Sequence, residues 1–196
     1  MLCFMSQFPI FNSYQDLSHS YWQKILKVGD WAIDATCGNG KDSLKLAQMV
    51  QGGGGVISLD IQEKALENAT LLFNQYPEDH LKIHLFKASH EQFPEIVLSK
   101  PIRLIVYNLG YLPGGDKTIT TKAETTLESL KKSFTILKTG GLISITCYPG
   151  HLEGEREQAL LLSLLEQLDP SLWHVCHHLS LNRSKSPSLF LIQKKN

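Results

Sequence analysis

Two acidic residues and a pair of glycines occur at the spacing of a nucleotide-like cofactor site. Asp34 ends a short apolar run, and Gly38 and Gly40 follow it before a helical pattern begins at Lys41. Glycines here let the backbone turn tightly and approach a ligand, while the helix start directs unpaired N–H groups at it. Asp60 ends the next apolar run, where a carboxylate can bind both hydroxyls of a ribose. We therefore predict a cofactor site at the ends of two strands.

The residues around the glycine turn narrow the choice of cofactor. A dinucleotide fingerprint needs a third glycine where this chain has Ser43, and the sequence G-K-[ST] of a Walker loop does not follow the turn either. S-adenosylmethionine carries a ribose, an amino acid and a positive charge, and a carboxylate beside the turn suits a cation. The sequence therefore favours S-adenosylmethionine over a nicotinamide cofactor.

A second group of reactive side chains follows the strand expected over residues 103–107. The loop N-L-G-Y-L-P-G-G-D-K, residues 108–117, lies at the carboxyl end of that strand. Methyl transfer from a sulfonium is an in-line displacement, which depends on positioning and electrostatics and needs no covalent intermediate. We expect the side-chain oxygen of Asn108 and the carbonyl of Leu109 to accept the protons of an amine and aim its lone pair at the methyl group.

Other side chains near this loop suit an RNA base. We expect Tyr111 to stack on a planar ring, Asp116 to accept a proton and Lys117 to meet an RNA phosphate. His151 follows the next strand, and it either lines the same pocket or caps the helix that comes after it. The alternative for Asn108 and its neighbours is an ordinary turn without a catalytic role.

A sheet of parallel strands is needed to bring these side chains together. Strands are expected over 31–34, 56–60, 81–86, 103–107, 142–147, 173–180 and 188–192, and helices over 13–26, 41–50, 65–73, 122–137 and 153–168. This alternation predicts an α/β fold of the Rossmann-like class I methyltransferase type. Its sheet would have seven strands, mostly parallel, with a C-terminal antiparallel hairpin and helices on both faces.

Two other places on this scaffold bear on the site. Ser89 and His90 follow the third strand, whose end faces the crevice where an adenine would lie. His19 is inside the first helix, and we interpret it as a partly buried structural residue. The alternative is that this helix covers the mouth of the cofactor site and brings His19 to the substrate.

The composition is that of an ordinary globular protein. The 196 residues include 19 basic and 19 acidic ones, so the formal net charge is zero and no overall field indicates a nucleic-acid partner, although a local patch suffices for RNA. We expect one domain, with an N-terminal arm and helix over 1–28 and a core over 29–196. The absence of a signal peptide pattern and of a long apolar run indicates a soluble, cytoplasmic protein with no membrane partner.

Cysteine and histidine spacing predicts no metal site. The four cysteines include no C-x-x-C pair, so we expect neither a disulfide framework nor a thiolate zinc site, in keeping with a reducing compartment. On a strand, His174 and His178 would share one face while His177 faces the other, and no carboxylate completes a ligand set at this spacing.

Several motifs together resemble one known family. They are D-A-T-C-G-N-G-K-D (34–42), L-D-I-Q (59–62), Y-N-L-G-Y-L-P-G-G-D-K (107–117), a threonine-rich run with Thr121, Thr125, Thr126 and Leu127, and Y-P-G-H (148–151). The chain is similar in these motifs to the YtqB/MnmM family of class I S-adenosylmethionine-dependent methyltransferases, over nearly its whole length from about Ser18 to Ile192. Members are often described as rRNA methylases and are associated with the wobble uridine of tRNA.

The resemblance implies a reaction and a set of residues. The reaction is methylation of the amino group of 5-aminomethyl-2-thiouridine in the tRNA anticodon loop. The implied cofactor residues are Asp34, Gly38, Gly40 and Asp60, with Asn39 and Gln62 beside them. The full set of residues expected to bind the cofactor also includes Thr36, Asp42, Ile61, Ser89, His90 and Asn108. The implied catalytic or pocket residues are Asn108, Tyr111, Asp116 and His151. Alternatives are methylation of rRNA or of a small-molecule amine, and a cofactor-binding subunit without catalysis.

The chain departs from the family pattern mainly near the substrate. Lys41 stands where the family commonly has histidine, and Glu153 stands where it commonly has glycine. Residues 182–188 read N-R-S-K-S-P-S in place of N-x-x-N-x-P-P, and Arg183 and Lys185 would serve RNA equally well. A homodimer is one way in which a chain of zero net charge would combine basic patches.

Overall fold

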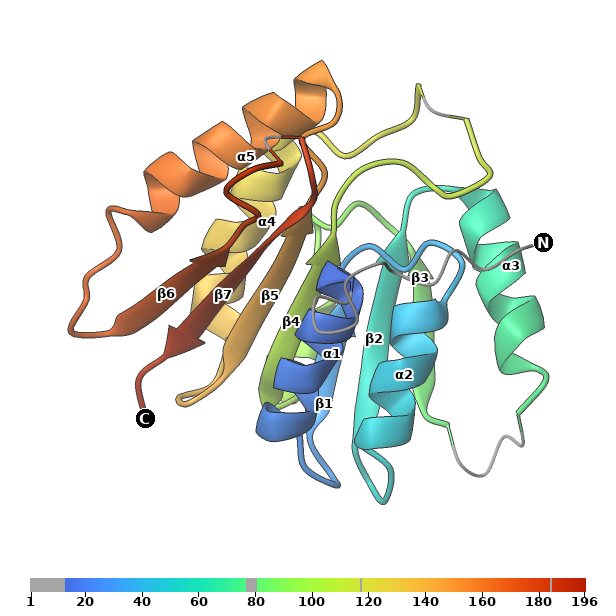
Figure 1. The fold of residues 1–196 in the computed structure, drawn as a ribbon. Coiled ribbons are helices and arrows are strands. Elements are labelled where there is room, and N and C mark those ends of the chain that lie inside the picture. Colours follow the sequence, from blue (N-terminus) through green and yellow to red (C-terminus); the bar gives the residue numbers. More distant parts are fainter. Residues whose placement is uncertain (1–12, 77–80, 117, 184) are drawn as a thin grey trace.

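The computed structural model describes residues 13–76, 81–116, 118–183 and 185–196. Seven strands form one sheet in the order β3-β2-β1-β4-β5-β7-β6 (Figure 1). The strands are β1 (Trp31–Asp34), β2 (Gly55–Asp60), β3 (Ile83–Lys87), β4 (Ile102–Asn108), β5 (Leu142–Cys147), β6 (Trp173–His178) and β7 (Ser188–Lys194). Neighbours among β1 to β5 are parallel, and β7 lies antiparallel between β5 and β6. The predicted class I methyltransferase sheet and its C-terminal hairpin are confirmed.

The ends of the five predicted helices lie within three residues of the predicted positions, and one short helix is additional. They are α1 (Tyr14–Ile25), α2 (Lys41–Met49), α3 (Glu63–Phe73), α4 (Ala123–Ile136) and α5 (Leu152–Leu165), together with a short 3₁₀ helix, η2 (Glu95–Ser99), that the sequence did not indicate. The last helix ends three residues before the predicted Leu168. It does so because Gln167 and Leu168 donate to carbonyls three residues back, a tighter turn than an α-helix.

Helices cover both faces of the sheet, as predicted (Figure 1). On one face, Trp22 and Leu26 of the α1 segment and Leu46 of α2 pack with the sheet residues Leu104 and Leu189. On the other face, residues of α4 and α5 pack on the alternate side chains of the same strands. Side chains alternate along a strand, so each strand supplies apolar residues to both layers. No helix within the described ranges is long and apolar enough to cross a membrane.

The parallel register brings the predicted site residues to one edge of the sheet. Asp34 at the end of β1 is level with Ser58 of β2 and Val106 of β4. Asn108 at the end of β4 is level with Thr146 of β5. The loops that follow these strands therefore meet beyond the same edge, where ligands bind in open α/β sheets.

Candidate active site

A cleft of about 1070 Å³ opens at this edge of the sheet. The loops that follow β1 to β5 line it, together with Gln15 of α1 and Lys185 near β7. The predicted site residues in its lining are Thr36, Gly38, Asn39, Asp42, Asp60, Ile61, Gln62, Ser89, His90, Asn108, Tyr111 and His151. Asp34, Gly40 and Asp116 are not lining residues.

Asp60 joins the glycine turn to the end of β2. One carboxylate oxygen accepts the backbone N–H of Gly38 at 2.8 Å, and the other accepts the backbone N–H of Gln62 at 2.9 Å. Burial raises the pKa of Asp60, and these N–H groups oppose the rise. The carboxylate faces the cleft with lone pairs still available, as a ribose site requires.

Both glycines of the turn adopt a backbone conformation that favours glycine, and Gly40 also lies in a close packing contact. Both have positive φ, +52° at Gly38 and +81° at Gly40, which a side chain rarely adopts. A Cβ on Gly40 would also lie 2.9 Å from side-chain atoms of Ala69 and Phe73. Gly40 therefore allows the start of α2 to pack against α3, and this packing sets the position of the turn.

Asn39 connects the glycine turn to two other elements. Its side-chain nitrogen donates to the carbonyl of Pro113 at 3.3 Å, and its side-chain oxygen accepts from Asn68 of α3 at 2.8 Å. The turn, the loop after β4 and α3 are thus held together at the cleft by one amide.

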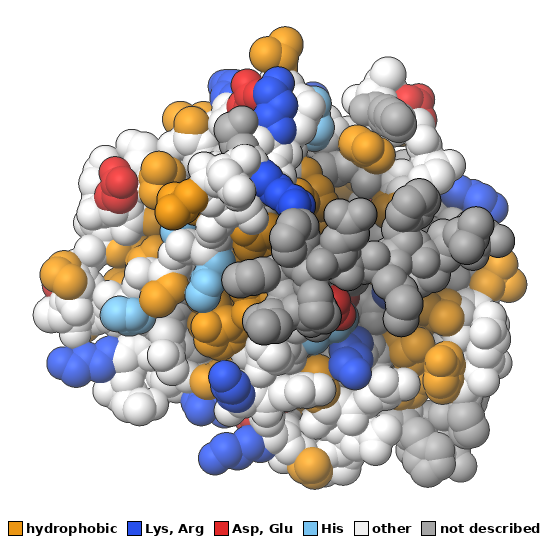
Figure 2. All heavy atoms as spheres, viewed as in Figure 1, with side chains coloured by type: hydrophobic (Ala, Val, Ile, Leu, Met, Phe, Trp, Pro, Cys, Tyr) orange, Lys and Arg blue, Asp and Glu red, His pale blue; other side chains and the backbone are white. Residues whose placement is uncertain are grey.

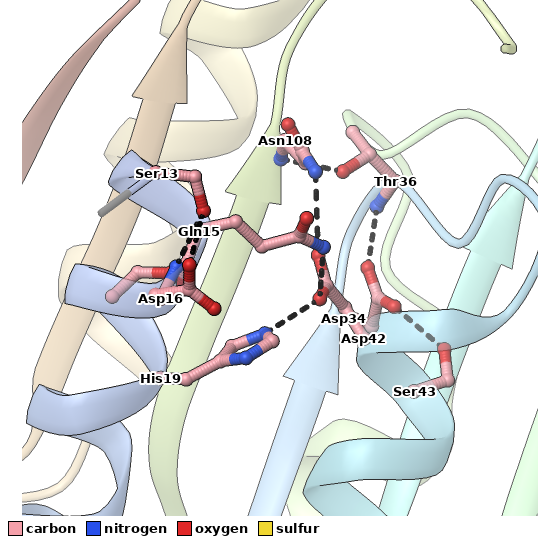
Figure 3. A network of polar contacts seen from close by, with 10 residues as sticks. Ser13, Gln15, Asp16, His19, Asp34, Thr36, Asp42, Ser43 and Asn108 are labelled. Atoms are coloured by element: carbon pink, nitrogen blue, oxygen red, sulfur yellow. Dashed lines mark hydrogen bonds and ion pairs between the residues drawn. The ribbon is translucent and has the colours of Figure 1, made fainter. Parts of the chain in front are cut away.

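Asp34 lies behind the glycine turn. It is 1% exposed and accepts hydrogen bonds from the Thr36 backbone N–H at 3.2 Å and the Ser43 hydroxyl at 2.6 Å (Figure 3). Ser58 donates in turn to Ser43. Burial, with the nearby Asp42 charge, raises the pKa of Asp34 to about 7. The structure therefore places Asp34 where it supports the turn, without exposing it to the cleft.

Asp42, in the first turn of α2, collects three side-chain hydrogen bonds. Gln15 and His19 of α1 donate to its Oδ1 at 3.1 and 2.9 Å, and the amide nitrogen of Asn108 donates to its Oδ2 at 3.3 Å (Figure 3). Burial alone would raise the pKa of this carboxyl, but the donors, His19 first among them, outweigh it and lower the pKa. Asp42 is therefore a buried carboxylate at the junction of α1, α2 and β4.

Asn108 is held from its backbone and from its side chain. Its backbone N–H donates to Thr36 Oγ1 at 2.7 Å. An ionised Asp42 can only accept hydrogen bonds, so the NH₂ group of Asn108 faces it and the amide oxygen is directed elsewhere. Tyr148, beside Asn108, has its pKa raised by burial and by the Asp42 charge, while the Asn108 contact opposes the rise. Asn108 therefore has one side-chain acceptor, its amide oxygen, which can take a hydrogen bond from a donor group of a substrate.

Tyr111 and His151 lie close together in the lining of the cleft. Their ring centroids are 6.2 Å apart, and Tyr111 is 41% exposed. His151 Nδ1 accepts the backbone N–H of Gly154 at 3.1 Å, so this residue caps α5 and also lines the cleft. The two interpretations of His151 drawn from the sequence both describe its position. An exposed ring beside an imidazole is suited to stacking on a base.

Asp116 is separated from this group. Its Oδ1 accepts both the backbone N–H and the hydroxyl of Thr118 at 2.8 Å, and these bonds lower its pKa. A carboxyl with a lowered pKa and an exposed position is a poorer proton acceptor than the sequence suggested. The neighbouring Lys117 lies outside the described residues.

The end of β3 supplies neutral surface to the cleft. His90 is 8% exposed, and burial lowers its pKa to about 4, so its ring is uncharged at neutral pH. Ser89 lies next to it, and Ile61 after β2 is 53% exposed in the same cleft. A neutral surface suits an uncharged ring, and the placement of an adenine here stays a prediction.

The buried carboxyl of Glu157 supports the loop after β4, a role that the sequence did not indicate. Thr121 Oγ1 accepts the backbone N–H of Gly110 at 2.9 Å and donates to the buried carboxyl of Glu157 at 3.0 Å. Thr126 donates to the same carboxyl at 2.5 Å. Burial raises the pKa of Glu157. The sequence signal for this role is an acidic residue four positions before Leu161 on the buried face of α5.

The charges of the site fit S-adenosylmethionine. Asp42 and Asp60 both raise the pKa of the buried Asp34, which means that the three carboxyls share a region of negative potential. A ligand with a sulfonium and an ammonium group relieves that potential. The described residues contain no group of three His, Cys, Asp or Glu side chains arranged to hold a metal ion.

The fold and the site are those of a class I methyltransferase. A family model described as "Putative rRNA methylase" matches residues 56–194. The chain belongs to this family, and its enzymes are S-adenosylmethionine-dependent methyltransferases. The resemblance stated from the motifs is confirmed.

Relatives support the same conclusion. The chain is 39% identical over 190 residues to the chloroplastic tRNA (mnm(5)s(2)U34)-methyltransferase of Arabidopsis thaliana, covering 92% of this chain and 69% of that one. A crystal structure from Clostridium thermocellum with the same description as the family superimposes with a TM-score of 0.87 at 35% identity, covering 94% of this chain and 98% of that one. SMU.1697c of Streptococcus mutans, solved in complex with SAH, has a TM-score of 0.78 at 31% identity over 97% and 99% of the two chains.

Proposed function

We propose that this protein methylates the aminomethyl nitrogen of 5-aminomethyl-2-thiouridine at the wobble position of tRNA. The observation that carries the proposal is the orientation of Asn108, whose NH₂ group donates to Asp42, so that its amide oxygen would accept a hydrogen bond from the amine. The Arabidopsis relative, 39% identical, is named for a modified uridine at the same tRNA position. Its name supports the choice of substrate.

The cofactor would be held in the part of the cleft formed by the ends of β1, β2 and β3. Asp60 would accept the ribose hydroxyls, with Gln62 and the Gly38 turn beside it. His90 and Ile61 would flank the adenine, and Asp42 would supply negative charge near the cationic part of the ligand. When bound, S-adenosylmethionine supplies an electrophilic methyl group on a sulfonium.

The acceptor half would be formed by Asn108, Tyr111 and His151. The amine must attack as a free base, because an ammonium has no lone pair. The nitrogen–carbon bond would form as the carbon–sulfur bond breaks, which would leave a neutral thioether, and the methylated nitrogen would release its extra proton to solvent. Asn108 Oδ1 and the carbonyl of Leu109 would accept the amine N–H groups and aim its lone pair, while Tyr111 stacks on the base.

The anticodon loop would meet basic side chains around the cleft. Lys41, Lys122 and Lys185 line it, and Lys185 lies 3.6 Å from Glu155 of α5. On the face shown in Figure 2, Lys and Arg side chains occur at several separate places. The chain has a formal net charge of zero, so we expect it to bind RNA through a few phosphate contacts at the rim of the cleft and not through a broad basic surface.

Nucleoside mass spectrometry of total tRNA, from cells with and without the gene, tests the proposal. We expect deletion to cause 5-aminomethyl-2-thiouridine to accumulate and its N-methylated form to disappear. Restoring the wild-type gene should reverse both changes, and an Asn108→Ala gene should not. Unchanged tRNA nucleosides would refute the wobble-uridine assignment, and rRNA or a small-molecule amine would then become the candidate substrate. Full complementation by Asn108→Ala would instead favour a cofactor-binding subunit without catalysis.

A further inference from the structure

We propose that His19 and Gln15 of α1 are positioning residues for methyl transfer, because together they hold the Asp42 carboxylate in the orientation that fixes the amide of Asn108. This inference rests on the proposed function and adds a role for α1 in it. The helix α1 precedes the first strand, and its contribution to the site comes through Asp42.

The two oxygens of Asp42 are divided between two elements. Oδ1 accepts from Gln15 Nε2 at 3.1 Å and from His19 Nε2 at 2.9 Å, while Oδ2 accepts from Asn108 Nδ2 at 3.3 Å (Figure 3). Two donors on one oxygen restrict rotation of the carboxylate about its terminal torsion, which is otherwise broad. The direction of Oδ2, and with it the direction of the Asn108 amide, therefore depends on α1.

The protonation states of the network follow from its geometry. Asp42 is 8% exposed and accepts from all three partners, as an ionised carboxylate does. His19 Nε2 must then carry a proton. If Asp42 lost this arrangement, the amide of Asn108 would lose the contact that directs its NH₂ group away from the substrate. An NH₂ group cannot accept an amine proton, so the acceptor would no longer be held in place.

The helix is well anchored for this role. Gln15 and His19 are four residues apart and lie on one face of α1. Trp22, one turn further on, is 3% exposed in the core beneath the helix, and its ring lies 4.6 Å from the ring of His19. Ser13 caps the helix by accepting the backbone N–H of Asp16. The two donors are thus presented from a rigid element, which is what positioning requires.

His19→Ala and Gln15→Ala test the inference by kinetics. We expect His19→Ala to lower kcat for tRNA carrying 5-aminomethyl-2-thiouridine by about 10- to 100-fold, with Gln15→Ala following in the same direction and less strongly. The Kd for S-adenosylhomocysteine, measured by calorimetry, should change less than about threefold, because the ribose site is left intact. His19→Gln retains a donor at similar reach and should recover most of kcat.

Tyr14→Phe is the matched control on the same helix. It removes the 3.0 Å hydrogen bond between Tyr14 and Ser180, which does not lead to the cleft. We expect Tyr14→Phe to keep the wild-type kcat and to change the melting temperature about as much as His19→Ala does. If Tyr14→Phe lowered kcat as much as His19→Ala does, general loosening of α1 would explain the loss and the inference would be wrong.

An NMR measurement tests the inference without catalysis. The side-chain NH₂ protons of Asn108, assigned with Asn108→Asp in ¹⁵N-asparagine-labelled protein, should shift in His19→Ala and in Asp42→Asn, and stay in place in Tyr14→Phe. An Asn108 signal that moves in Asp42→Asn and is unchanged in His19→Ala would overturn the role of His19. If the wild-type protein did not methylate the tRNA, the proposed function would fail, and the NH₂ signal would still decide whether α1 orients Asn108.

Discussion

The carboxylate of Asp60 accepts the backbone N–H of Gly38 over 2.8 Å. This bond joins the end of β2 to the glycine turn after β1, so one side chain both shapes the floor of the cleft and faces the ligand. At the end of β4, the NH₂ group of Asn108 donates to Asp42 and its oxygen is directed elsewhere. We therefore expect substitution of Asp60 to affect mainly cofactor binding and substitution of Asn108 to affect mainly turnover.

Asp60→Ala should act mainly on cofactor binding. It removes the acceptor for ribose hydroxyls and leaves the Gly38 N–H without its partner, so we expect the Kd for S-adenosylhomocysteine to rise about 10- to 100-fold. At saturating cofactor, kcat should fall much less. Calorimetry with Asp60→Asn, which retains one acceptor oxygen, should give an intermediate Kd.

Asn108→Ala should act mainly on turnover. Loss of the acceptor for the amine protons should lower kcat by about 100-fold or more while the Kd for S-adenosylhomocysteine changes only a few-fold. Steady-state kinetics and calorimetry on the same preparation check both quantities. Equal effects of Asn108→Ala and Asp60→Ala on cofactor binding would contradict this division of roles.

The pH dependence of the methyl-transfer step should reflect the substrate amine. Single-turnover rates should rise by about one log unit per pH unit until the bound amine is neutral, and then level off, because only the free base attacks. Rapid-quench measurements at saturating cofactor separate this step from product release. A flat profile from mildly acidic to alkaline pH, with chemistry limiting, would argue against an amine acceptor.

Asp34 should make stability depend on pH. Burial raises its pKa from 3.8 to about 7 in the folded protein, so the folded state holds this proton more tightly than the unfolded chain does. Its stabilising contribution to the free energy of unfolding is fully present below about pH 4 and is lost as the pH rises to about 7. The upper limit of this contribution is about 4 kcal/mol. Urea unfolding at several pH values should show this decline in the wild type and a smaller one in Asp34→Asn. Parallel curves for the two proteins would show that Asp34 does not carry a raised pKa.

Thr121→Val should loosen the loop after β4. It removes the acceptor for the Gly110 N–H and one donor to Glu157, so we expect a lower kcat/KM for tRNA and a loss of about 1 to 3 kcal/mol in the free energy of unfolding. Thr126→Val removes the other donor to Glu157 and does not contact the loop. The two variants should have similar stability, and limited proteolysis should cut residues 109–121 faster only in Thr121→Val. Faster cutting in both would place the effect in Glu157 and not in the loop.

The sequence by itself determined the sheet, its helices and the strand ends that form the site. The apolar runs ending at Asp34 and Asp60, and the turn at Gly38 and Gly40, are local patterns whose preferences are decided within a few residues. Parallel strands necessarily bring such ends to one edge, so the cleft could be located before its shape was known. The position of Asn108 in it follows from the same rule.

Only the tertiary structure decided which side chains meet there. Asp34 supports the turn from behind, Asp116 caps a turn outside the cleft, and Glu157 reaches the loop after β4 from α5. His19 contacts Asp42 across 23 residues of sequence, and Asn108 contacts it across 66. Contacts at such separation depend on the rotation of each helix and the depth of its packing on the sheet. Those are set by the whole core and leave no local pattern in the chain.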